Sequence, residues 1–213
     1  MKRGLFITFE GSEGSGKTTQ LKLLANALRK NGVPHVVTRE PGGSRLSTQL
    51  RYWILDKLDY NLMPRTELLL FLADRAQHVG EVIEPALKQG QVVLCDRYSD
   101  STLAYQGGGR GFDMGLLKIL NRAASPIVPD LTILFDLPVE IGLKRAKGRG
   151  KGKDRMEREN LKFHRNVRRV YLQTARKEKN RFIVVDASRS QETTYHEMLI
   201  KLIAKLPRLN RAR

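Results

Sequence analysis

The chain has 213 residues, enough for one substantial α/β domain with its own hydrophobic core. Hydrophobic residues make up 40% of it and no apolar run approaches the roughly 20 residues that cross a bilayer, which argues against a disordered chain and against a membrane protein. The 39 Lys and Arg residues against 22 Asp and Glu give a net charge of +17, which favours anionic partners such as nucleotides or nucleic acid.

The first predicted element is a buried strand over residues 5–9, which runs into a glycine-rich segment. Gly11, Gly16, Lys17 and Thr18 occupy the fixed positions of the phosphate-loop pattern G-x-x-x-x-G-K-[ST], and apolar residues at helical spacing follow. In such a loop, backbone N–H groups and the helix dipole surround phosphates, the lysine reaches the β- and γ-phosphates, and the threonine binds Mg²⁺. The sequence therefore predicts an ATP phosphate site formed by Gly11, Ser12, Glu13, Gly14, Ser15, Gly16, Lys17, Thr18 and Thr19.

Strand and helix signals alternate along the rest of the chain. Further strands are predicted over 33–38, 92–95, 131–137 and 182–185. Helices are predicted near 46–54, 65–88, 116–123, 139–146, 163–174 and 195–206. Glycine clusters predict a loop over 105–111 and a flap over 147–153. Five strands separated by helices predict a three-layer α/β fold, with a five-stranded parallel sheet flanked by helices.

Asp96 and Arg97 directly follow the predicted strand 92–95, at the edge of a parallel sheet where α/β proteins bind ligands. A carboxylate there can hold Mg²⁺, directly or through water, and a guanidinium presents a planar fork that suits a phosphate. The pair indicates a second phosphate site that faces the first. A purely structural Asp96–Arg97 salt bridge is the alternative.

Phe71 and Arg75 are four residues apart on a predicted helix, so they share a face. An aromatic ring beside a guanidinium can stack a nucleobase and hydrogen-bond its edge. The alternative is a core phenylalanine and a surface arginine, because many helix faces have this composition.

Glycine alternates with cationic residues over 148–155. Glycine makes the backbone mobile, and the cations could close over transferring phosphates. A solvent-exposed basic loop with no catalytic part is the alternative.

Together these motifs resemble the thymidylate kinase family of P-loop nucleoside monophosphate kinases. The resemblance lies in 9–20 (FEGSEGSGKTTQ), 39–43 (REPGG), 68–75 (LLLFLADR), 96–98 (DRY) and 104–109 (AYQGGG), in family order and spacing. It implies a P-loop kinase fold in one domain over 1–213, with a flexible LID at about 147–155. It also implies a homodimer that transfers the γ-phosphoryl of ATP to dTMP with Mg²⁺, for dTTP supply.

The resemblance further assigns roles by motif position. It implies that Phe71 stacks on thymine, that Arg75 hydrogen-bonds a base carbonyl, and that Tyr105 crowds the sugar 2′ position. It implies that Arg97 holds the dTMP phosphate and that Asp96, with Thr18, serves Mg²⁺. The full substrate set so implied is Glu13 (sugar 3′-OH), Arg39, Arg51, Phe71, Arg75, Arg97, Thr102, Tyr105 and Gln106.

Some family members carry a transfer arginine inside the phosphate loop, and this chain has none there. It thus resembles the bacterial subclass, in which the LID supplies that arginine. Arg149 is the first candidate, and Arg155, Lys151 and Lys153 are the alternatives. The implied catalytic set is Lys17, Arg97 and Arg149.

Two other functions stay open from the residues alone. Another nucleoside monophosphate or deoxynucleoside kinase is one, although Phe71, Arg75 and Tyr105 favour a thymine deoxynucleotide. A nucleic-acid-binding P-loop ATPase is the other, motivated by the charge of +17, although no basic–aromatic repeat indicates a specific nucleic-acid surface. A single cysteine, Cys95, and the lack of a signal-peptide pattern predict a cytoplasmic protein.

Overall fold

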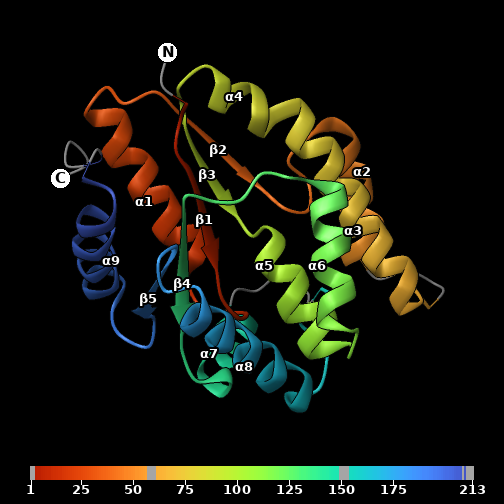
Figure 1. Cartoon of the computed structure of the whole chain (residues 1–213). Helices are drawn as coiled ribbons and strands as arrows, with labels where there is room; N and C mark the ends of the chain where they lie inside the picture. Colours follow the sequence, from red (N-terminus) through yellow and green to blue (C-terminus); the bar gives the residue numbers. More distant parts are fainter. Residues whose placement is uncertain (1–2, 57–60, 149–153, 208, 210–213) are drawn as a thin grey trace.

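A computed structural model describes residues 3–56, 61–148, 154–207 and 209 (Figure 1). Its centre is a five-stranded parallel sheet, which confirms the prediction, with the strand order β2-β3-β1-β4-β5. The strands are β1 (Phe6–Glu10), β2 (His35–Arg39), β3 (Val92–Asp96), β4 (Leu131–Asp136) and β5 (Phe182–Asp186). Phe9 of β1 lies opposite Asp96 of β3, so the carboxyl ends of these two strands meet at one edge of the sheet.

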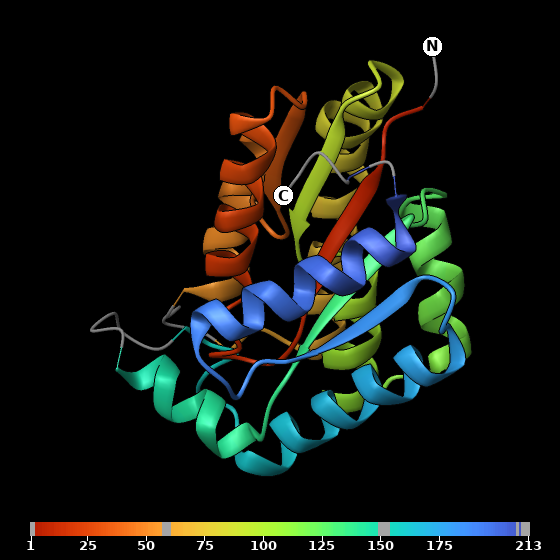
Figure 2. The same cartoon turned by 90° about the vertical axis from the view of Figure 1, so that its left-hand side faces the viewer.

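Helices cover both faces of the sheet (Figures 1 and 2). The helices α1 (Lys17–Lys30) and α9 (Gln191–Lys205) pack on one face, where Leu24 and Met198 join Ile7 and Phe9 in a buried cluster. In Figure 2, α9 crosses in front of the strands. The remaining helices are α2 (Arg45–Leu55), α3 (Pro64–His78), α4 (Glu84–Lys88), α5 (Ser99–Thr102), α6 (Met114–Ala124), α7 (Val139–Lys147) and α8 (Leu161–Lys177).

A second cluster unites α3, α6 and α8 on the other side of the sheet, and a third lies under α4. Successive side chains along β1 point to opposite faces of the sheet. Ile7 and Phe9 therefore belong to the first cluster, and Phe6 belongs to the third on the other face. The result is three layers with the sheet in the middle. No helix among the described residues is long and apolar enough to cross a membrane.

The predicted long helix over 65–88 is a continuous helical stretch in the structure, made of α3, the π-helical segment η1 (Val79–Ile83) and α4. Pro85 explains the change of winding, because its ring has no N–H to donate and crowds the carbonyl four residues earlier. A wider π turn just before the proline accommodates that loss.

The predicted loop over 105–111 is wrong for most of its length. Helix α5 continues into the π-helical segment η2 (Leu103–Gly109). Its glycines serve close packing rather than a break: a Cβ on Gly109 would lie 2.3 Å from the ring of Phe163, and one on Gly108 would lie 2.9 Å from the carbonyl oxygen of Asn166. Glycine therefore lets η2 lie directly against α8.

The predicted LID is described only at its two ends. Helix α7 ends at Lys147, Gly148 follows, and the described chain resumes at Asp154. Arg149, Lys151 and Lys153 lie outside the described residues.

Candidate active site

The phosphate loop joins β1 to α1. Gly14 and Gly16 adopt positive φ angles of 69° and 80°, and a Cβ on Gly14 would lie 1.9 Å from the carbonyl oxygen of Gly142, so only glycine fits there. Lys17 folds back over the loop, and its Nζ donates hydrogen bonds to the carbonyl oxygens of Gly11 (2.9 Å) and Ser12 (3.0 Å). Burial, and then the nearby Arg97, lower the pKa of Lys17 to about 8. Lys17 is therefore mostly charged at neutral pH.

A cavity of about 580 Å³ opens beside this loop, within the usual size range of ligand pockets. Of the predicted site residues, its lining contains Glu13, Gly14, Ser15, Gly16, Lys17, Thr18, Thr19, Arg39, Arg51, Phe71, Arg75, Asp96, Arg97, Thr102, Tyr105 and Gln106. Gly11 and Ser12 lie behind the lining, where their carbonyls hold Lys17. Arg149 lies outside the described residues. All five of the motif segments that carry the resemblance thus meet at one cavity.

Thr18 and Asp96 lie side by side where the phosphate loop meets the end of β3. The Thr18 hydroxyl donates a hydrogen bond of 2.5 Å to Asp96 Oδ2. Mg²⁺ is coordinated by oxygen ligands such as hydroxyls and carboxylates. The protein usually supplies one or two of these ligands, and substrate phosphates and water supply the others. These two residues fit a magnesium ion bound to ATP. No cluster of three or more His, Cys, Asp or Glu that could form a metal cage occurs in the part of the chain that the structure describes.

Arg97 lines the same cavity and contacts the phosphate loop directly. Its Nη2 lies 2.6 Å from Glu13 Oε1, and its guanidinium lies over the ring of Tyr105, 4.9 Å from the centroid. The Tyr105 hydroxyl donates to the same Glu13 oxygen at 2.6 Å. Burial alone would raise the pKa of Glu13, but Arg97, Lys17 and the Tyr105 hydrogen bond outweigh it and lower that pKa to about 2. The carboxylate partner of Arg97 is therefore Glu13 and not the neighbouring Asp96.

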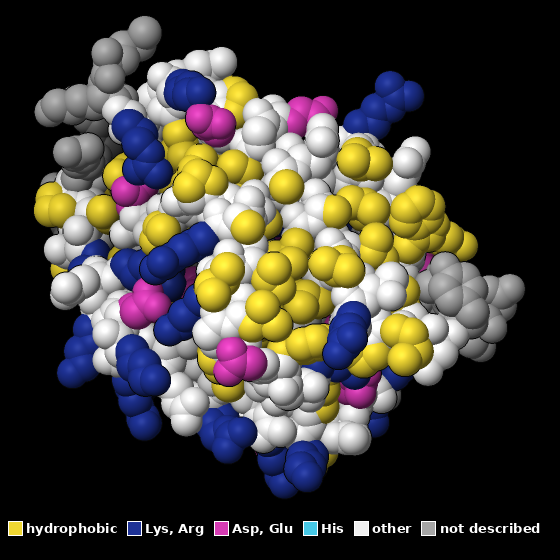
Figure 3. Space-filling model, turned by 45° about the vertical axis from the view of Figure 1, so that its right-hand side comes forward, with side chains coloured by type: hydrophobic (Ala, Val, Ile, Leu, Met, Phe, Trp, Pro, Cys, Tyr) yellow, Lys and Arg dark blue, Asp and Glu magenta, His cyan; other side chains and the backbone are white. Residues whose placement is uncertain are grey.

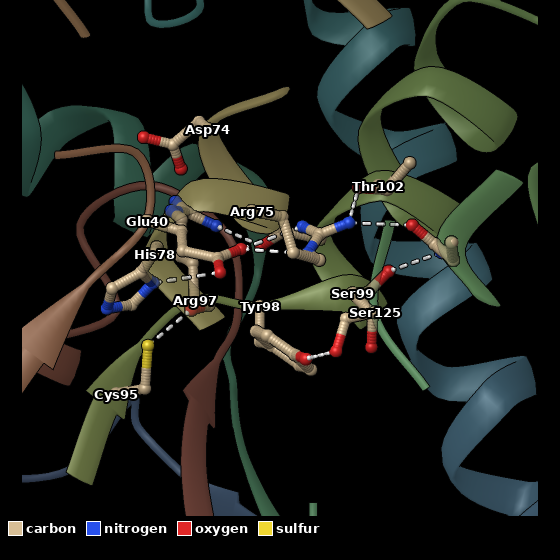
Figure 4. Close-up of polar contacts among 12 residues, drawn as sticks. Glu40, Asp74, Arg75, His78, Cys95, Arg97, Tyr98, Ser99, Thr102 and Ser125 are labelled. Carbon is tan, nitrogen blue, oxygen red and sulfur yellow. Dashed lines mark hydrogen bonds and ion pairs between the residues drawn. The ribbon is translucent and has the colours of Figure 1, made fainter. Parts of the chain in front are cut away.

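Arg75 is almost completely buried, with 1% of its surface exposed, so the alternative of a surface arginine is wrong. Figure 4 shows how its guanidinium is held. Glu40 accepts from Nε and lies 2.9 Å from Nη2, while Nη1 donates to Thr102 Oγ1 (3.0 Å) and Asn121 Oδ1 (2.6 Å). His78 Nδ1 lies 3.0 Å from the other Glu40 oxygen. The cavity edge therefore presents an arginine fixed in position.

Glu67 is a buried carboxylate that the sequence motifs did not point to. It accepts from Gln106 Nε2 at 2.8 Å, and it pairs with Arg110 at 2.9 Å and Arg155 at 2.6 Å. Arg155 also donates to the carbonyl of Ile54 at 2.9 Å. Arg155 is thus bound at the base of the predicted LID, next to Asp154, which lines the cavity.

The chain has a parallel sheet with a phosphate loop after β1. One cavity beside that loop holds two oxygen ligands suited to Mg²⁺, Thr18 and Asp96, together with Arg97. These features define the class of P-loop phosphotransferases. The family model of thymidylate kinase matches residues 9–198 of the chain. The chain therefore belongs to the thymidylate kinase family, which confirms the resemblance in its motifs. As a member of that family it is an enzyme that phosphorylates dTMP for dTTP synthesis and uses ATP.

Individual relatives match over almost their whole length. The chain is 53% identical to thymidylate kinase of Carboxydothermus hydrogenoformans, over 92% of this chain and 95% of the relative. It is 50% identical to thymidylate kinase of Geobacter sulfurreducens, over 96% and 99%. Among solved structures, thymidylate kinase from Ehrlichia chaffeensis matches with a TM-score of 0.76 and 34% identity, over 95% of this chain and 99% of that one.

Proposed function

We propose that the chain transfers the γ-phosphoryl group of ATP to dTMP in the cavity beside Lys17, giving dTDP and ADP. The observation that carries this proposal is the placement of Arg97 next to the phosphate loop, in one cavity with Lys17, Thr18 and Asp96. One cavity with two phosphate-binding groups suits a phosphate donor and a phosphate acceptor that meet in line. No covalent intermediate is needed, because positioning and charge neutralisation account for this type of transfer.

In this proposal residues 11–19 bind the ATP phosphates. Lys17 neutralises negative charge on the γ-phosphoryl group while that group is transferred. Arg97 holds the dTMP phosphate, and Arg39 and Arg51 line the same cavity. Thr18 and Asp96 would hold Mg²⁺, which supplies further neutralisation at the ATP phosphates.

The nucleoside end of dTMP lies against the remaining lining residues. Phe71 is half-buried and offers its ring for stacking on thymine, while Arg75 and Thr102 present polar atoms to the base edge. Tyr105 is fixed by its hydrogen bond to Glu13, so its ring excludes a 2′-hydroxyl and leaves Glu13 near the sugar 3′-OH. Gln106 closes this end, held by Glu67.

Arg149 is the proposed transfer cation of the LID, and Lys151 and Lys153 stay as alternatives. Arg155, an alternative from the sequence, is bound to Glu67 and the Ile54 carbonyl and is absent from the cavity lining. The LID at about 147–155 thus has one end fixed by Arg155. The whole chain, 1–213, works as a single kinase domain.

A homodimer is part of the proposal. Figure 3 shows apolar side chains gathered on the face formed by α3 and α6. Leu69 of α3 is 59% exposed and Ile119 of α6 is 67% exposed, with Leu116 beside them. Exposed apolar patches of this kind mark interfaces, and a second copy of the chain would cover this one. Ile119→Glu should shift the mass in solution to that of a monomer, and Ile200→Glu on α9 should leave it unchanged.

The location proposed is the cytoplasm, where the buried free thiol of Cys95 stays reduced. No specific nucleic-acid partner is proposed. Several of the basic residues that contribute to the charge of +17 pair with carboxylates on the surface, as Arg165 does with Glu140.

Steady-state kinetics of two variants test which end of the cavity binds dTMP and which binds ATP. Phe71→Ala should raise the KM for dTMP by about 5- to 100-fold, the value of one base stack, with little change in the KM for ATP. Lys17→Ala should instead lower kcat by about 10² or more. Ile200→Ala, a remote truncation on α9, is the control. If Phe71→Ala changed only the ATP parameters, the two substrates would be assigned to the wrong ends of the cavity.

A further inference from the structure

Glu10 is a buried carboxylate that the proposed transfer does not use. It ends β1, it has no exposed surface, and it is absent from the cavity lining. It nevertheless accepts three hydrogen bonds of 2.7 Å, from the backbone N–H of Tyr98 and from the hydroxyls of Ser101 and Tyr171. Burying a carboxylate costs desolvation free energy, so a buried carboxylate with three hydrogen-bond donors indicates a specific role.

The first of these donors belongs to the peptide unit that follows Arg97. Arg97 has a φ of 71°, and it is the one non-glycine residue with positive φ among the described residues. Such a backbone conformation is unfavourable for an L-residue and persists only when neighbouring contacts determine it. The bond from Tyr98 N–H to Glu10 is one such contact, and it directs the Arg97 side chain toward the phosphate loop.

The other two donors touch the Arg97 guanidinium itself. Arg97 Nη1 lies 3.3 Å from the Tyr171 hydroxyl and 3.4 Å from Ser101 Oγ. Each hydroxyl can give its hydrogen to Glu10 while its oxygen accepts from Arg97. The arrangement is a relay from anion through hydroxyl to cation, in which each bond strengthens the next.

We propose that Glu10 and Tyr171 are positioning residues for Arg97: through the Tyr98 N–H and the Ser101 and Tyr171 hydroxyls they hold the guanidinium at the dTMP phosphate. Tyr171 belongs to α8, 161 residues from Glu10 in the sequence, so the second half of the chain helps to build the phosphate site. This inference rests on the proposed role of Arg97. It predicts that substrate binding depends on a tyrosine that touches no substrate.

The experiment is a double-mutant cycle read as the dissociation constant for dTMP. Burial, and then the neighbouring Asp100, raise the pKa of Glu10 to about 7, so pH 8 keeps its carboxylate charged. Tyr171→Phe keeps the ring and removes the hydroxyl, and it should weaken dTMP binding about tenfold while the KM for ATP stays the same. Ser101→Ala should weaken dTMP binding in the same direction. Tyr195→Phe on α9 is the matched control and should change neither constant.

The cycle adds Arg97→Ala to each variant. If Tyr171 acts through Arg97, Tyr171→Phe should have almost no further effect on dTMP binding in the Arg97→Ala background. A tenfold loss in both backgrounds, or a fall in melting temperature with dTMP binding unchanged, would overturn the inference and leave Tyr171 a structural residue. Arg97→Ala alone tests the proposed function separately, because unchanged dTMP binding there would refute the role of Arg97 itself.

Discussion

Asp74 on α3 carries a buried charge that the fold does not fully compensate. Its Oδ1 accepts from the N–H of Gly42 at 3.0 Å, while its Oδ2 has no hydrogen-bond partner in the described part of the chain. Figure 4 shows it close to the Glu40–Arg75–His78 group. Burial, and then the Glu40 carboxylate, raise the pKa of Asp74 from 3.8 to about 6. The folded protein therefore binds a proton at Asp74 more tightly than the unfolded chain does.

The sign of the stability effect follows directly. Between pH 3.8 and about 6 the folded state holds more protons at this site, so the free energy of unfolding falls as pH rises. Above that range the charged Asp74 destabilises the protein by up to about 3 kcal/mol, at about 1.4 kcal/mol per pKa unit. Asp74→Asn keeps the acceptor for Gly42 and removes the charge. It should raise the melting temperature at pH 8 by up to about 6–12 °C, since a chain of this size gains about 2–4 °C per kcal/mol.

The assay is thermal unfolding of the parent and Asp74→Asn at pH 4, 6 and 8, with Asp56→Asn at the exposed end of α2 as the control for a general charge effect. The difference between parent and Asp74→Asn should be near zero at pH 4 and largest at pH 8. A difference that is the same at all three pH values, or a variant that is less stable at pH 8, would refute this account of the Asp74 site.

Four further predictions concern the reaction and the binding of nucleic acid. Tyr105→Ala should narrow the preference for dTMP over its ribonucleotide, and an unchanged ratio of kcat/KM would count against the placement of Tyr105. Arg149→Ala should lower kcat strongly, by about 10³ or more, with little change in the KM for dTMP. Arg155→Ala should instead lower the melting temperature and raise the KM for dTMP, because it frees the base of the LID from Glu67; the reverse pattern would move the transfer role to Arg155. Duplex DNA should bind weakly and dissociate as salt rises, and tight sequence-selective binding at physiological salt would contradict the metabolic role.

Much of the fold was predictable from local patterns. The apolar runs that became β1, β3 and β4 are nearly continuous because strands in the middle of a parallel sheet are buried on both faces. The error at η2 has a physical origin: clustered glycines are typical both of loops and of helices packed very closely, and only the partner helix α8 distinguishes the two. That partner begins more than 50 residues later in the sequence.

The residues of the candidate site likewise divide into those that the sequence predicted and those that it did not. Residues within one motif, such as Lys17 and Thr18, were predictable because the phosphate loop is local in sequence. Glu67, Asn121 and Tyr171 were not, because each acts through partners distant in the chain. One signal was available on α3, where polar residues recur at helical spacing on either side of the apolar run 68–73; these are Glu67, Asp74, Arg75 and His78, all of them buried. A buried polar stripe of this kind indicates a binding face.

The most direct measurement is ADP release from ATP in the presence of Mg²⁺ and one monophosphate at a time. The account predicts that dTMP gives the highest kcat/KM in a panel that includes dUMP, dCMP, dGMP and the ribonucleotide of thymine, with dTDP as the product. Release that no monophosphate stimulates, or that responds to nucleic acid instead, would contradict it.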